Sequence, residues 1–163
     1  MQRLSQLLRL LIDAEVEFVL VGGLAAAIHG STLNTRDVDI CCRFSEANLL
    51  RIQKGLADLH PVHRMRPDLP LDLTPKQCKD LKNLYIKTDL GIIDCLGEVL
   101  GVGEFDTVLS HSIQIDLPIG PLRILDIDTL IKAKEAMSRP HDLITIQHLE
   151  AIKAQVSNSI TSK

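Results

Sequence analysis

The chain has 163 residues, 45% of them hydrophobic and 24% charged, a composition typical of one globular domain with a substantial core. Its net charge of −3 argues against a broad electrostatic surface for DNA or RNA. With one tyrosine, three phenylalanines and no tryptophan, it also has few rings on which single-stranded bases could stack.

The sequence indicates a protein of the reducing cytoplasm. Charged residues interrupt the apolar run at the N-terminus, which therefore lacks the core of a signal peptide, and no run approaches 18 apolar residues. The cysteines form no C-x-x-C pair and lie mostly in apolar runs, so we expect buried free thiols rather than metal ligands or disulfides. They are Cys41, Cys42, Cys78 and Cys95.

Helices and strands alternate in the first part of the chain. Helical spacing of leucine and isoleucine opens it, short apolar runs predict strands, and Ser45 is suited to cap the helix that follows it. Gly22-Gly23 is expected to end the first strand as a turn. The expected elements are a helix over 2–14, a strand over 17–21, a helix over 24–29, a loop over 30–34, a strand over 37–42 and a helix over 46–59.

The second part begins with a proline-rich segment over 61–75, which we expect to be irregular with at most a short strand. Hairpin strands and two C-terminal helices follow, the first of them capped by Asp126 or Asp128. The expected elements are strands over 84–87 and 92–96, a helical turn over 105–109, strands over 113–115 and 122–125, and helices from about 126 to 137 and 140 to 157.

This order predicts an α/β (α+β) fold, with a mixed β-sheet, helices on one face and a helical C-terminus. We expect residues 1–163 to form a single domain. Its core would span about 15–125, and its C-terminal helices would span about 126–157.

Three carboxylates stand out. Asp37 and Asp39 are two residues apart on a predicted strand, so they share one face about 7 Å apart, and they repel unless a cation lies between them. Asp94 interrupts an apolar strand, where a charge without a partner is costly. Gly22 and Gly23 precede a helix whose N-terminal amides could approach phosphate. Together these features predict a divalent cation and a phosphate group at one site.

Each feature also has an ordinary structural explanation. The glycines could form a plain turn, the strand aspartates could be solvated, and Asp94 could belong to a structural ion pair. Lys134 and Arg139 could lie on a solvated helix face. For His29 we expect a packing or hydrogen-bonding role rather than metal ligation.

The order and spacing of these residues resemble the nucleotidyltransferase superfamily that includes DNA polymerase β. The local pattern is most similar to the minimal AbiEii-like branch, some of whose members are toxins of toxin–antitoxin pairs. The segment 130–143 also resembles the C-terminal helical motif of that branch, so the resemblance covers about 4–155. The chain departs from it at Gly23, where many members have serine, and at His141, where lysine is usual. The matching residues are Gly22, Gly23, His29, Thr35, Arg36, Asp37 and Asp39.

The resemblance implies transfer of a nucleoside monophosphate from an NTP to a hydroxyl acceptor on RNA (tRNA included), a protein or a small molecule, with release of pyrophosphate. It implies a Mg²⁺ or Mn²⁺ cofactor held by three catalytic residues, Asp37, Asp39 and Asp94. The alternative is a non-catalytic nucleotide- or partner-binding module of a toxin–antitoxin-like system, with an antitoxin protein as partner. No membrane partner is expected. The residues implied to bind the nucleotide phosphates are Gly22, Gly23, Thr35, Arg36, Lys134 and Arg139.

Overall fold

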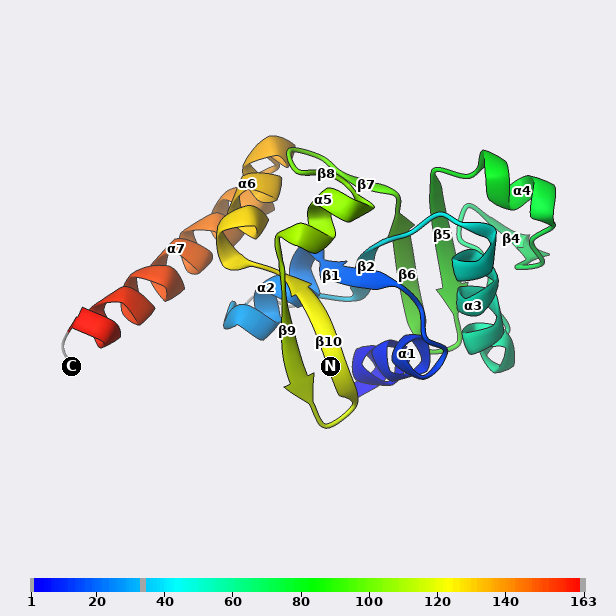
Figure 1. Cartoon of the computed structure of the whole chain (residues 1–163), viewed down its shortest axis with the longest axis horizontal. Coiled ribbons are helices and arrows are strands. Elements are labelled where there is room, and N and C mark those ends of the chain that lie inside the picture. The colour runs from blue at the N-terminus through cyan, green and yellow to red at the C-terminus, as the bar shows by residue number, and fades with distance from the viewer. Residues whose placement is uncertain (1, 33–34, 162–163) are drawn as a thin grey trace.

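The computed structural model describes residues 2–32 and 35–161 (Figure 1). In the first part of the chain, helices and strands alternate as predicted, with boundaries that differ by a few residues. The elements are α1 (Gln2–Asp13), β1 (Phe18–Val21), α2 (Gly22–His29), β2 (Asp37–Cys42), α3 (Glu46–Leu56) and a 3₁₀ turn (Ala57–Leu59). Part of the predicted loop over 30–34 lies outside the described residues.

The second part contains more regular structure than the sequence predicts. The short hairpin β3–β4 occupies the segment that we expected to be irregular with at most a short strand, and the hairpin β7–β8 and helix α4 were not predicted. The elements are β3 (Val62–His63), β4 (Arg66–Pro70), α4 (Pro75–Asp80), β5 (Asn83–Thr88), β6 (Gly91–Leu96), β7 (Glu98–Val99), β8 (Gly103–Glu104), α5 (Phe105–Ser110), β9 (Ser112–Leu117), β10 (Gly120–Leu125), α6 (Ile127–Met137) and α7 (Pro140–Thr161).

Within the described residues the strands form a mixed eight-stranded sheet and a separate hairpin, β7–β8. The order in the large sheet is β4-β3-β5-β6-β2-β1-β10-β9. Strand β2 pairs in parallel with β6, and β1 pairs in parallel with β10, whereas the other neighbours are antiparallel. The fold is therefore the predicted mixed α/β architecture.

The central strands β2, β6 and β5 have one buried face and one open face. Alternate residues such as Val38, Ile93 and Ile86 are fully buried, and α1 and α3 pack on their side of the sheet (Figure 1). The residues between them, including Asp39, Asp94 and Tyr85, are only partly buried. The polar groups of the predicted site thus point to the face that these two helices leave uncovered.

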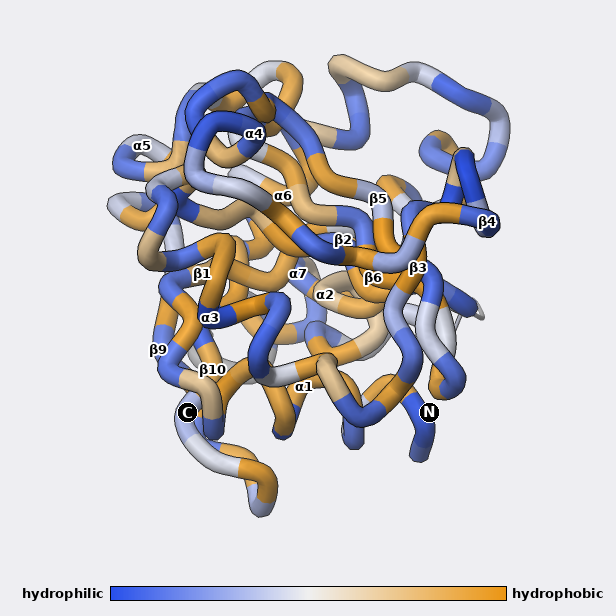
Figure 2. Tube along the Cα trace, turned by 90° about the vertical axis from the view of Figure 1, so that its right-hand side faces the viewer, coloured by the Kyte–Doolittle hydropathy of each residue, from blue (hydrophilic) through white to orange (hydrophobic). Residues whose placement is uncertain are grey.

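Helices α2 and α6 lie beside this open face, and the long helix α7 packs on α6 and extends away from the sheet (Figure 1). Figure 2 shows apolar segments along the central strands, whereas β4, at the outer edge of the sheet, is largely hydrophilic. None of the helices in the described residues combines the length and the apolar character that a membrane span requires.

The glycine pair is placed differently from our expectation. Gly22 and Gly23 do not form a turn after β1 but are the first two residues of α2, which follows the strand directly. Gly22 has a positive φ of 70°, a conformation that side chains with a Cβ rarely adopt. The strand therefore passes into the helix within one residue, and this abrupt change of direction requires glycine.

Asn48 joins the first strands to α3. Its side chain is fully buried; Oδ1 accepts from the Glu17 amide at 2.7 Å, and Nδ2 donates to the carbonyl oxygens of Glu17 and Arg43 at 3.0 and 2.8 Å. These contacts connect the segment before β1 with the residue after β2. Backbone polar groups that would otherwise be buried without partners are satisfied in this way.

We expect Asn48→Ala to lower the free energy of unfolding by about 2–4 kcal/mol, because it removes three partly buried hydrogen bonds, including those to the Glu17 amide and the Arg43 carbonyl oxygen. Urea unfolding followed by circular dichroism measures this change. The matched control is Asn83→Ala at an exposed position of β5, for which we expect a change within about 0.5 kcal/mol. Equal effects of the two variants would contradict the prediction.

Candidate functional site

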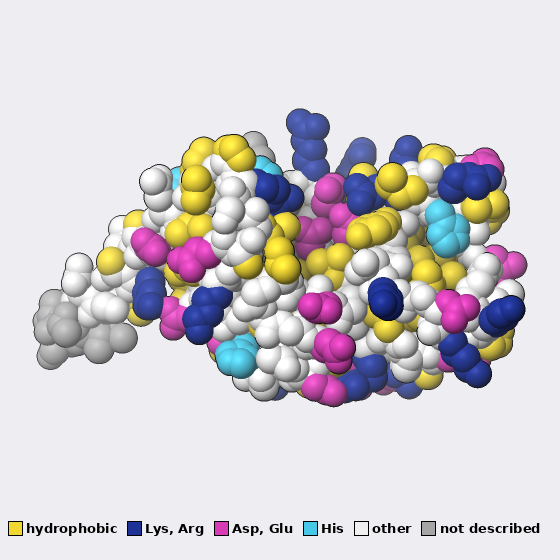
Figure 3. All heavy atoms as spheres, turned by 90° about the horizontal axis from the view of Figure 1, so that it is seen from above, with side chains coloured by type: hydrophobic (Ala, Val, Ile, Leu, Met, Phe, Trp, Pro, Cys, Tyr) yellow, Lys and Arg dark blue, Asp and Glu magenta, His cyan; other side chains and the backbone are white. Residues whose placement is uncertain are grey.

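The strand register brings the predicted carboxylates to one place. Asp39 on β2 lies directly opposite Asp94 on β6, in parallel strands about 4.8 Å apart, so the two side chains share a face. Asp37 precedes Asp39 by two residues on that face. The three predicted residues therefore lie together on the open side of the sheet. Figure 3 shows acidic side chains gathered in a hollow near the middle of the molecule, with Lys and Arg side chains beside it.

The electrostatics of this face reflect an accumulation of negative charge. The pKa of Asp39 is raised to about 6, first by burial and then by the neighbouring charges of Asp94 and Asp37, against the opposing effect of Lys134 and Arg139. Burial also raises the pKa of Asp94, while the nearby Arg64 opposes the shift. Such a group of carboxylates is stabilised by a cation.

Gly22 allows the N-terminus of α2 to approach Asp39. A Cβ on Gly22 would lie 2.3 Å from Asp39 Oδ2, a distance that no real side chain tolerates. The residue before the helix, Val21, is apolar and has no side-chain oxygen with which to cap the first amides. The first amides of α2 therefore have no side-chain cap beside Asp39, and an anion in the site could bind them.

The two predicted cations of the C-terminal helices are held by one buried carboxylate, Asp142. Arg139 donates to it from Nε at 2.7 Å, from Nη2 at 3.2 Å and from its backbone amide at 3.1 Å, while Lys134 Nζ donates at 3.4 Å. Although burial opposes ionisation, the hydrogen bonds and charges of Arg139 and Lys134 keep the pKa of Asp142 below its usual value. Asp142 thus fixes both cations near Asp39.

A cavity of about 210 Å³ lies between Asp39 and these cations, and Asp37 and Asp94 are not among the residues that line it. Asp39, Gly22, Lys134 and Arg139 contribute its polar surface together with Glu98. Its remaining lining is apolar and comes from β1, β6, the β7–β8 hairpin and α6. Those residues are Val21, Leu96, Val99, Leu100, Leu130, Ala133 and Met137.

Three of the predicted phosphate-binding residues, Gly23, Thr35 and Arg36, do not line this cavity. Thr35 Oγ1 donates to the carbonyl oxygen of Asp37 at 3.3 Å and lies against the first turn of α2, where a Cβ on Gly23 would be 3.0 Å from it. Arg36 is exposed and lines a separate cleft beside the start of α1. The structure thus gives Thr35 a place beside the carboxylate strand and does not bring Arg36 to the cavity.

Other predictions about individual residues are confirmed. His29 Nε2 donates to the carbonyl oxygen of Leu125 at 2.9 Å, which ties α2 to the end of β10 and is the structural role we expected. All four cysteines are buried with free thiols.

The sequence analysis missed Arg64, which lies between β3 and β4 with Nη2 3.1 Å from Asp94 Oδ1. Its segment was expected to be irregular, and nothing local in the sequence links it to residue 94. Asp142 was also not among the predicted site residues, although its side chain is completely buried. The sequence feature that could have revealed Asp142 is its spacing from Lys134 and Arg139 around the junction between α6 and α7.

The residues fit a divalent cation that is completed by a substrate. Among the described residues, no three His, Cys, Asp or Glu side chains converge as a ready-made metal site. However, Asp94 Oδ1 is buried without a hydrogen-bond partner in the described structure, and the carboxylates beside it are the oxygen donors that Mg²⁺ and Mn²⁺ take. Mg²⁺ commonly binds through one or two carboxylates together with substrate phosphates, which this arrangement permits.

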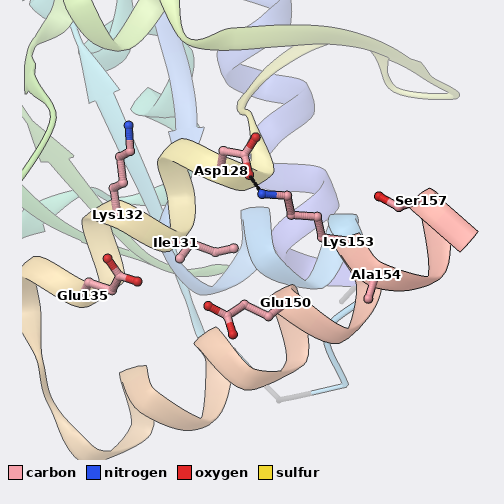
Figure 4. Close-up of a pocket in the computed structure, with 8 residues that line it drawn as sticks. All are labelled: Asp128, Ile131, Lys132, Glu135, Glu150, Lys153, Ala154 and Ser157. Atoms are coloured by element: carbon pink, nitrogen blue, oxygen red, sulfur yellow. Dashed lines mark ion pairs between the residues drawn. The ribbon is translucent and has the colours of Figure 1, made fainter.

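A second cleft, of about 670 Å³, lies between α6 and α7 and contains none of the predicted site residues (Figure 4). Asp128 and Lys153 form an ion pair across it, and Lys132 points away from α7. Glu135 and Glu150 add negative charge to the same walls. Charges of both signs alternate here without converging on one point, so we place the candidate site at the carboxylates instead.

The comparisons with known proteins support the fold. No protein-family model matches the sequence, nor does any curated protein. Among solved structures, the chain is similar to the antibiotic-resistance factor ANT(2'')-Ia, with a TM-score of 0.54 and 12% identity over 99% of this chain and 92% of that one. It is also similar to TM1012 of Thermotoga maritima, named as a nucleotidyltransferase, with a TM-score of 0.52 and 12% identity over 93% and 91% of the two chains. The chain therefore has a nucleotidyltransferase fold.

The raised pKa of Asp39 predicts a pH-dependent gain in stability for Asp39→Asn. The folded-state pKa of about 6 lies above the ordinary value of 3.8, so ionisation of Asp39 destabilises the folded protein above pH 6, by at most about 3 kcal/mol. We expect Asp39→Asn to raise the free energy of unfolding by about 1–3 kcal/mol at pH 7.5. The gain fades between pH 6 and pH 4, because the native protein takes up the proton in that range.

Denaturant unfolding at pH 7.5, 6 and 4.5 measures this difference, and Asp116→Asn on the exposed face of β9 is the matched control. A lower stability of Asp39→Asn at pH 7.5, or a gain that does not change with pH, would contradict the prediction.

Proposed function

We propose that this protein is a nucleotidyltransferase that transfers a nucleoside monophosphate from an NTP to a hydroxyl acceptor and releases pyrophosphate. The observation that carries the proposal is the register of Asp39 opposite Asp94, with the free N-terminus of α2 packed against Asp39. This combination places oxygen donors for a cation next to amides for a phosphate, within a nucleotidyltransferase fold.

The triphosphate would bind between α2 and the helix junction. Gly22, the first residue of α2, lines the cavity on one side, and Arg139 and Lys134 line it on another. Because Asp142 already fixes these two cations, little side-chain entropy is lost when phosphate binds to them. The apolar lining beyond them gives the nucleoside a surface on which to pack.

Asp37, Asp39 and Asp94 would hold Mg²⁺ or Mn²⁺ together with oxygens of the triphosphate. When bound, the cation supplies Lewis-acid stabilisation to the attacking and leaving oxygens of the displacement. The raised pKa of Asp39 follows from burial and from the charge of Asp94, so a cation at this position would relieve a repulsion that the free protein carries.

The transfer joins the acceptor oxygen to the α-phosphorus and breaks the bond between that phosphorus and the oxygen that bridges to the β-phosphate. Asp94 would accept the proton of the hydroxyl, since burial has raised its pKa toward the range that suits a base. Lys134 and Arg139 would stabilise the charge that develops on the departing pyrophosphate.

The acceptor would approach from the side of β5 and the β3–β4 hairpin, because the nucleotide occupies the side of α2 and α6. Arg64 and the exposed Lys87 lie on this side. Arg64 contacts Asp94. Lys87 on β5 is paired with Ile92 on β6, which is in turn paired with Asp37 on β2. RNA, including tRNA, a protein or a small molecule could each supply the hydroxyl, and the open face would admit a large acceptor.

One observation favours the alternative of a non-catalytic nucleotide- or partner-binding module, such as a component of a toxin–antitoxin-like system. Arg64 already provides a positive charge for Asp94, so this carboxylate is balanced without a metal ion. Retention of all three carboxylates favours the enzyme, because a purely structural site has no need for the repulsion between Asp39 and Asp94.

Activity is tested by incubating the protein with each α-labelled NTP, Mg²⁺ and total tRNA or cell extract. We expect label transfer that EDTA abolishes and that Asp39→Asn lowers by about a hundredfold or more, because a cation ligand is lost. Asp116→Asn is the control with unchanged transfer. Absence of Mg²⁺-dependent NTP binding in calorimetry would contradict the proposal.

Nucleotide binding is expected to depend on Arg139. Arg139→Gln should weaken NTP binding about tenfold, equivalent to about 1.4 kcal/mol, because it removes a charge-assisted contact to phosphate. Calorimetry with NTP and Mg²⁺ measures this, with Arg123→Gln on the exposed face of β10 as the control. An unchanged affinity of Arg139→Gln would remove the helix junction from the phosphate site.

A further inference from the structure

Arg64 occupies a position that connects the outer hairpin to the carboxylates. Its backbone amide donates to the carbonyl oxygen of Tyr85 at 2.9 Å, and its guanidinium carbon lies 5.1 Å from the centre of the Tyr85 ring. Tyr85 is directly opposite Asp94 in the sheet, so the arginine side chain runs across the ring toward that carboxylate. Its Nη2 atom lies 3.1 Å from Oδ1 and 3.3 Å from Oδ2 of Asp94.

This ion pair is incompletely satisfied. Among the described residues, Arg64 Nε and Asp94 Oδ1 are the two buried side-chain polar atoms without a hydrogen-bond partner, and both belong to this one pair. Nη2 is close to Oδ1, but the geometry directs its hydrogen bond to Oδ2 instead. A buried acceptor and a buried donor that do not meet indicate a contact that is not optimised for stability.

We propose that Arg64 is a positioning residue that takes the place of the divalent cation at Asp94 in the free protein and leaves Asp94 when the cation binds. The inference rests on the proposed function, since it treats Asp94 as a cation ligand. Asp94 Oδ1, which has no hydrogen-bond partner although Arg64 Nη2 lies 3.1 Å from it, is the oxygen that a cation would take, and Arg64 is the charge that competes for the same carboxylate.

The surroundings of Arg64 allow it to move. A cation at Asp94 repels a guanidinium a few ångströms away, and the ring of Tyr85 offers that guanidinium a second attractive surface. The following strand, β4, is exposed along its whole length at the edge of the sheet, so few packed contacts resist a displacement of the hairpin. Once released, Arg64 would face the side from which the acceptor approaches.

The test is the affinity of the full-length protein for Mn²⁺ alone, measured by electron paramagnetic resonance at pH 7.5 without nucleotide. We expect Arg64→Met to bind Mn²⁺ about two- to fivefold more tightly, the effect of removing one partly exposed ion-pair partner. Arg64→Lys keeps the charge and should stay close to the original affinity. The matched control is Arg66→Met, which removes an exposed arginine of the same hairpin that pairs with Asp68.

The same measurement in an Asp94→Asn background separates the causes. If Arg64 acts through Asp94, the gain from Arg64→Met disappears there, whereas a gain that persists overturns the inference. An unchanged or weaker affinity of Arg64→Met, with Asp39→Asn and Asp94→Asn both weakening Mn²⁺ binding, overturns the inference and leaves the proposed function standing. Unchanged binding in both aspartate variants overturns both. Circular dichroism confirms that each variant is folded.

Discussion

The repulsion between Asp39 and Asp94 is the constraint on which the site depends. Strand pairing fixes the two carboxylates opposite each other on neighbouring parallel strands, and partial burial reduces the screening of their charges by water. The fold does not remove this repulsion but surrounds it with positive charge, from Arg64 on one side and from Lys134 and Arg139 on the other. A protein selected for stability alone would have little reason to keep this arrangement.

Residues outside the group of Asp37, Asp39 and Asp94 determine the surroundings of these carboxylates. Asp142 is fully buried and accepts from Arg139 and Lys134, which orients two flexible side chains at the cost of burying a third charge. Gly22 makes room in a different way, because its missing Cβ lets the end of α2 come close to Asp39. Both features are understandable as support for an anionic ligand.

The sequence predicted the strand that carries Asp37 and Asp39 and the strand that carries Asp94, because local periodicity places a residue on a face. It could not show that Asp39 stands opposite Asp94, since register is decided by packing of the whole sheet. Arg64 escaped detection because its contact spans thirty positions and begins in a proline-rich segment that periodicity does not describe. The start of α2 at Gly22 was missed because glycine is usually a turn residue, and here the close approach to Asp39 overrides that preference.

The positive charges on the two sides of the site are held with different firmness, which indicates different roles for Arg64 and for the pair Lys134 and Arg139. Lys134 and Arg139 are fixed by Asp142 with four hydrogen bonds, so they are ready for a ligand that always arrives with the same charges, such as a triphosphate. Arg64 has an unsatisfied donor and lies on an edge hairpin, so it is held only loosely. A loosely held cation next to the third carboxylate can exchange with a metal ion, whereas a fixed one would exclude it. Under the proposed function, this asymmetry would put the rigid half of the site beside the nucleotide and the adjustable half beside the acceptor.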